Sequence, residues 1–105
     1  MELQHIEDAL VEAGERAKKD GIKLIKSDFA RYQKGTNVVE CMCPMTCLTR
    51  DPKSTLSEFM AVLGIDQVAN LWDIVMGIDG SSNSVLNPDF EYYRLGQRVA
   101  KRLGL

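Results

Sequence analysis

The chain has 105 residues, enough to fill one hydrophobic core, so we expect a single domain over residues 1–105. Hydrophobic residues make up 45% of it and charged residues 27%, proportions typical of a folded protein rather than a disordered one. The formal net charge of −2 excludes a general attraction to nucleic acid or anionic membranes. No apolar run approaches the roughly 20 residues of a membrane span, and the N-terminal stretch lacks the order of a signal peptide. We therefore expect a cytoplasmic protein without a membrane segment.

The first part of the chain predicts a helix followed by a small hairpin. Apolar residues recur at three- and four-residue steps from 3 to 19, the period of an amphipathic helix. Two short runs rich in β-branched and aromatic residues, Phe29–Gln33 and Asn37–Met42, flank Gly35 and predict a hairpin. The stretch "IKLIK" before them is compatible with a further short strand.

A short helix and a longer one follow the hairpin. Pro44 suits the first turn of a helix, so residues 44–49 predict a short one. Thr55 and Glu58 form a capping box that begins the next helix, and Gly64 is a natural end for it.

Two more helices complete the expected fold. One runs from about Gln67 to Met76 with Asp66 as its cap, and Asn87-Pro88 begins the last, after a loop of turn residues. The elements together predict an α+β domain, mostly α, with an N-terminal helix, a small β-hairpin and about four further helices, two of them short. The predicted core consists of Ile6, Leu10, Val39, Cys43, Cys47, Phe59, Leu63, Leu71, Trp72, Val75, Leu95 and Val99.

All three cysteines lie in the stretch "VVECMCPMTCLTRDP", at Cys41, Cys43 and Cys47. Structural zinc needs about four ligands, and the only histidine, His5, lies on the first predicted helix, so a metal site requires that helix to pack onto the cysteines. A nucleophile is a second possibility, because a thiol at a helix N-terminus, as Cys43 would be, has a lowered pKa. Such a thiol also needs a base and an orienting group, which the sequence does not show. We therefore favour free, buried cysteines that pack in the core.

The loop "DGSSN" raises the possibility of a calcium site at Asp79. An EF-hand aligned on Asp79 requires glycine at its sixth position and glutamate at its twelfth, where this chain has Ser84 and Phe90. A standard EF-hand is thereby excluded, and a turn in which Asp79 and Asn83 bond the nearby backbone is the simpler interpretation.

The stretch "FMAVLGIDQVANLWDIVMG" superficially suggests a helix-turn-helix. Residues 64–80 contain no lysine or arginine but do contain Asp66, Asp73 and Asp79, which phosphates would repel. Nucleic acid is therefore an unlikely partner.

A basic stripe marks the C-terminal helix. Its members are Arg94, Arg98, Lys101 and Arg102. We expect these cations to offset the helix macrodipole and to keep that face solvated, rather than to bind an anionic partner.

Trp72 is the only tryptophan. Its place beside Leu71 and Val75 in a helical apolar pattern predicts burial against the C-terminal helix, near Tyr92 or Leu95. The competing hypothesis is that Trp72 is an exposed anchor for a partner, because tryptophan is enriched in interface hot spots.

The order of "CPMTCL", "AVLGID", the tryptophan-bearing helix, "GIDG" and "YYRLGQRVAKRL" resembles a scattered group of small bacterial and phage proteins of unknown function. The resemblance covers about residues 41–102. The chain departs from it at Met45-Thr46-Cys47, where the group has Leu-Gly-Ala, and at Ile78, where it has Phe. The resemblance implies an architecture, with a buried short helix after Cys-Pro, and transfers no site residue.

No catalytic set emerges, so we expect a non-catalytic protein-interaction or regulatory module, derived from a phage or mobile element. Its expected partner is another protein; no cofactor and no metal is expected, and a homo-oligomer is compatible with the sequence. The first alternative is a thiol-dependent enzyme or metal-binding protein with a site around Cys43, for which Cys41, Cys47, His5 and Asp79 are the further candidates. The second is a helix-turn-helix-like DNA-binding protein.

Overall fold

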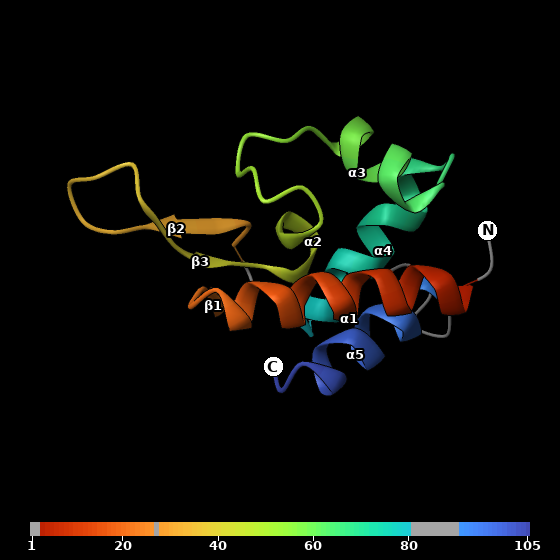
Figure 1. The fold of residues 1–105 in the computed structure, drawn as a ribbon. Coiled ribbons are helices and arrows are strands. Elements are labelled where there is room, and N and C mark those ends of the chain that lie inside the picture. The colour runs from red at the N-terminus through yellow and green to blue at the C-terminus, as the bar shows by residue number, and fades with distance from the viewer. Residues whose placement is uncertain (1–2, 27, 81–90) are drawn as a thin grey trace.

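Helix α1 (Leu3–Lys19) has the bounds that its apolar periodicity predicts, and it contacts both the sheet and the other helices. The computed structural model describes residues 3–26, 28–80 and 91–105 (Figure 1). The buried face of α1 carries Ile6 and Leu10, which belong to the main hydrophobic core. The helix packs beside α5 (Glu91–Arg102) and against α2 (Pro44–Cys47).

A three-stranded sheet follows α1, in the order β1-β3-β2. Strands β2 (Ala30–Tyr32) and β3 (Val39–Met42) form the predicted antiparallel hairpin, which extends away from the helices (Figure 1). The short strand β1 (Lys23–Leu24) pairs parallel with β3. The register shifts between Arg31 and Tyr32, and the last two residues of β3, Cys41 and Met42, are both buried.

Helix α3 (Leu56–Leu63) begins and ends where the sequence predicts. The Thr55 hydroxyl accepts a hydrogen bond from the Glu58 N–H at 3.3 Å, and Gly64 ends the helix with a φ of 69°. The next helix, α4, follows at a bend of 93°. Among the described residues no single helix is long and apolar enough to cross a bilayer; only α3 and α4 taken together reach that length.

Helix α4 (Val68–Asp79) differs from its prediction at both ends. Its N-cap is Gln67, which makes no side-chain capping bond, so Asp66 is not the cap. The helix continues past Met76 to Asp79, where Gly80 ends it with a φ of 73°. The short helix α2 likewise ends earlier than predicted, at Cys47. The expected cap of the last helix, Asn87-Pro88, lies outside the described residues.

Helices α4 and α5 cross at two glycines. A Cβ added at Gly77 would collide with the carbonyl oxygen of Tyr93, and one added at Gly96 would collide with that of Ile74. The backbones therefore approach more closely than any side chain would allow, and α4 packs on α5 more extensively than on any other helix.

The predicted fold class, α+β and mostly α, is confirmed by this arrangement. Most of the predicted core is also buried. The exceptions are Val39 and Val75, which are only partly buried, and Trp72, which is 38% exposed.

Candidate functional site

Cys43 lies at the junction where β3 leads into α2. It is the N-cap of α2, and its Sγ accepts a hydrogen bond from the Thr46 N–H at 3.4 Å and lies 3.3 Å from the Thr46 hydroxyl. The backbone N–H of Cys43 donates to the Phe29 carbonyl at 3.0 Å. The burial predicted for Cys43 and Cys47 is confirmed, Cys41 is buried as well, and all three are free thiols.

The electrostatics of the buried thiols oppose a nucleophilic role. Burial raises the pKa of Cys43 by more than its hydrogen bonds from Thr46 lower it, and the nearby Asp79 carboxylate raises it further. Burial and the neighbouring Cys43 raise the pKa of Cys47 to about 11. Both groups are therefore protonated at neutral pH, and a protonated thiol is a poor nucleophile and a poor metal ligand.

The candidate metal ligands are not brought together. Within residues 3–26, 28–80 and 91–105, no group of three histidine, cysteine or acidic side chains is placed to hold a metal ion. His5 lies exposed on α1, whereas the cysteines are buried. For Asp79, the loop on which the calcium hypothesis depends, including Asn83 and Ser84, lies outside the described residues.

The structure does bring Cys43 and Asp79 together, although 36 positions separate them in the chain (79 − 43 = 36). Both line a cavity of about 200 Å³ between the start of β2, the β3–α2 junction and α4, which we call the aromatic groove. The described residues that line it are Asp28, Phe29, Cys43, Trp72, Val75 and Asp79.

Trp72 lines this groove because α4 carries two apolar stripes. Leu71, Ile74 and Ile78 form the buried stripe, on the side of α4 that packs in the core. Trp72 and Val75 belong to the second. Val75 is partly buried and packs against the edge of the core, whereas Trp72 is exposed.

The predicted burial of Trp72 against α5, near Tyr92 or Leu95, is therefore wrong. A helix can direct only one stripe toward a given neighbour, and the close glycine crossing brings the Leu71 stripe to α5. Val68, one turn before Trp72, is 48% exposed and extends the outward stripe.

The aromatic groove has an aromatic wall and acidic charge. The Phe29 ring is 37% exposed and stacks on the buried ring of Phe59, with centroids 6.3 Å apart. Among the described residues of its lining the charged ones are Asp28 and Asp79, and Asp28 makes an exposed ion pair with Arg31 at 3.1 Å. Sequence reasoning missed Asp28 and Phe29 as site residues, because no local pattern marks them.

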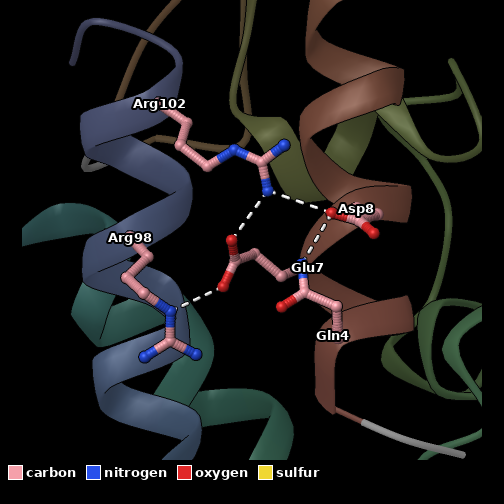
Figure 2. A network of polar contacts seen from close by, with 5 residues as sticks. All are labelled: Gln4, Glu7, Asp8, Arg98 and Arg102. Carbon is pink, nitrogen blue, oxygen red and sulfur yellow. Dashed lines mark hydrogen bonds and ion pairs between the residues drawn. The ribbon is translucent and has the colours of Figure 1, made fainter.

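A second polar cluster joins α1 to α5 (Figure 2). The carboxylate of Glu7, which is only 5% exposed, accepts hydrogen bonds from Arg98 Nε at 2.6 Å and from Arg102 Nη1 at 2.7 Å. Arg102 also donates to Asp8 at 3.0 Å, and Gln4 donates to the same carboxylate at 2.9 Å. Arg98 and Arg102 of the C-terminal basic stripe are thus engaged within the chain.

Glu7 has a lowered pKa because it meets two arginines. Burial alone raises the pKa of Glu7, but the hydrogen bonds and charges of Arg98 and Arg102 outweigh burial and bring it below its ordinary value of 4.5. The signal for this contact was present in the sequence, since Glu7 stands beside Ile6 within the apolar stripe of its helix. We regard the cluster as a structural clasp between the two helices.

No protein-family model matches the chain, and searches of the curated proteins and of the solved structures find no match. Its function therefore has to be inferred from the geometry of the aromatic groove and of the outward stripe of α4.

Proposed function

We propose that this chain is a small, non-catalytic module that binds another protein through its Trp72 face, formed by Phe29, Val68, Trp72 and Val75. The observation that carries the proposal is the exposure of Trp72 in the middle of a well-packed helix. An exposed tryptophan leaves a large apolar surface in water and adds nothing to the core. Tryptophan is, however, frequent as an anchor residue in protein interfaces.

The rest of the molecule supports a binding role for this face. The main core is filled by buried residues from all five described helices, and Trp72 is not among them. Every fully buried side-chain polar atom in the described part of the chain has a hydrogen-bond partner. The thiol that reaches the groove, Cys43, is protonated, which favours binding over thiol chemistry.

We further propose a reducing compartment such as the cytoplasm, because three free cysteines within seven positions (47 − 41 + 1 = 7) would be prone to oxidation elsewhere. An origin in a phage or mobile element rests on the resemblance of the motif order alone. Two of the stretches that carry the resemblance, "GIDG" and "RLG", contain Gly77 and Gly96, the two glycines at the crossing of α4 and α5.

Site-specific photo-crosslinking tests this function. A benzoylphenylalanine placed at Val68, at the edge of the Trp72 face, should crosslink a defined protein when the full chain is expressed in its native host. The same group at Val38, which is 54% exposed on the hairpin, is the matched control. The crosslink should disappear in the Trp72→Ala background while the fold, followed by circular dichroism, is kept.

Two results would contradict the proposal. One is a crosslinked product at Val68 that is no stronger than at Val38. The other is a product at Val68 that Trp72→Ala leaves unchanged in a folded chain.

A further inference from the structure

We infer that the partner presents a basic segment, and that a lysine or arginine side chain of this segment enters the aromatic groove between Trp72 and the carboxylates of Asp28 and Asp79. This inference rests on the proposed function and adds to it the chemistry of the partner.

The first support is the charge of the groove. Among the residues that the structure describes, its lining contains Asp28 and Asp79 and no lysine or arginine. The surrounding segment 64–80 also lacks cations and carries Asp66 and Asp73 in addition. Asp79 lies close enough to Cys43, another lining residue, for its charge to add to the rise that burial causes in the pKa of that thiol. A positive side chain is therefore favoured over a neutral or negative one.

The second support is the aromatic wall. Trp72 and Phe29 both line the groove and both remain partly exposed. The face of an aromatic ring attracts a cation, with tryptophan the strongest of the aromatic side chains and arginine the commonest partner. Aromatic and acidic groups in one groove thus favour the same occupant.

The third support is the behaviour of Asp28 within the chain. It already pairs with the guanidinium of Arg31, at 3.1 Å, so a guanidinium is accepted at this edge of the groove. Both partners of this pair are more than half exposed, and such pairs contribute little to stability. An incoming arginine can therefore share or replace Arg31.

The size of the groove fits a side chain rather than a metabolite. Its volume of about 200 Å³ lies below the roughly 300–1,000 Å³ of typical small-molecule sites. Neighbouring apolar residues of the partner would then cover Val68, which is 48% exposed one turn before Trp72, and the exposed part of Val75.

The single tryptophan provides the assay, because fluorescence of the intact chain reports on the groove directly. The probes are three blocked pentapeptides, glycine-leucine-X-leucine-glycine, with arginine, glutamine or glutamate at X. The arginine peptide should give a saturable change in emission with an affinity about tenfold or more above that of the glutamate peptide, and higher salt should weaken it.

Charge variants locate the interaction. Asp28→Asn should weaken the arginine peptide by about two- to fivefold, the range expected of an exposed charge pair. Arg31→Gln should strengthen it, because it removes the competing guanidinium. Asp66→Asn, which makes the same charge change outside the groove lining, should have the smaller effect.

The inference is overturned if the glutamine or glutamate peptide binds as tightly as the arginine peptide. It is equally overturned if none of the three saturates below about 10 mM, or if emission instead changes with protein concentration alone, which would indicate a second copy of the chain. Any of these results together with a Trp72-dependent crosslink at Val68 would leave the proposed function standing and remove only the basic partner.

Discussion

The glycine crossing of α4 and α5 supplies the sharpest test of the packing. In Gly96→Ala the new methyl group would lie 2.9 Å from the Ile78 nitrogen and 3.0 Å from the Gly77 Cα, and closer still to a carbonyl oxygen. Ordinary contacts begin near 3.5 Å, so the helices must separate by about half an ångström or more. Alanine gains about 1 kcal/mol of helix propensity, but the separation weakens the most extensive helix–helix contact of the fold. We expect a net loss of about 2–4 kcal/mol.

Gly14→Ala is the matched control. Its methyl group would meet only the terminal carbons of Leu103, at 2.7 and 2.9 Å, and the end of a leucine side chain can rotate away. The propensity gain then offsets most of the cost, so the change should stay below about 1 kcal/mol. Urea and thermal unfolding followed by circular dichroism measure both variants, and each kcal/mol corresponds to about 4–8 °C in Tm for a domain near this size.

Gly77→Ala should behave like Gly96→Ala, because its methyl group also meets backbone atoms of the opposite helix. The reasoning is refuted if the free energy of unfolding of Gly96→Ala lies within about 0.5 kcal/mol of the wild-type value, or if Gly96→Ala is no more destabilising than Gly14→Ala.

Three further predictions concern the clasp, the thiols and the tryptophan. Glu7→Gln should lower the free energy of unfolding by about 1.5–3 kcal/mol at neutral pH. Because the pKa of Glu7 in the folded chain is below 4.5, the stabilisation from its carboxylate is complete above pH 4.5 and is lost as the pH falls through the folded pKa. The acid unfolding curves of wild type and variant should therefore converge. Cys43 and Cys47 should react with a thiol reagent at pH 8 much more slowly than a free thiol, because both are buried and protonated, and all three cysteines should react at once in denaturant; one fast thiol in the native chain would support the thiol-enzyme alternative. Trp72→Ala should lower the free energy of unfolding by less than Leu71→Ala does, for which about 2–5 kcal/mol is expected because Leu71 is fully buried. The fluorescence emission of the native chain should be red-shifted, and a blue-shifted spectrum would show that Trp72 is buried.

The elements that the sequence predicts correctly are those determined by local interactions. The bounds of α1 follow from apolar residues within one helix, and those of α3 from the Thr55 cap and from Gly64, which needs a positive φ. The hairpin follows from composition around Gly35. None of these depends on which distant segment lies nearby.

The errors arise where contacts between distant segments determine the end of a helix or the side of it that is buried. Gly77 suggested a helix end because glycine is a weak helix former, yet the fold requires it inside α4 for the crossing with Gly96. Trp72 suggested burial because α4 is apolar around most of its circumference, and periodicity alone does not tell which stripe meets α5.

The candidate site was predictable only in part. Cys43 and Asp79 were both named from local motifs, but only the fold places them in one groove. Asp28 and Phe29 complete this groove from the start of the hairpin, with no sequence pattern to connect them to α4. Charge was the reliable signal, since the absence of cations from 64 to 80 is visible in the sequence itself.

The clasp between α1 and α5 has a consequence for biosynthesis. Glu7 and its partner Arg98 are 91 positions apart in the chain. Lys18 donates a hydrogen bond to the Leu103 carbonyl at 2.7 Å, and these two residues are 85 positions apart. A nascent chain can cover the part of α1 that packs on β1 and α2 early, but the part that packs on α5 stays exposed until translation reaches the last helix. During this interval chaperones have a ready binding site in α1, and ribosome-bound chains stalled before residue 91 should remain protease-sensitive.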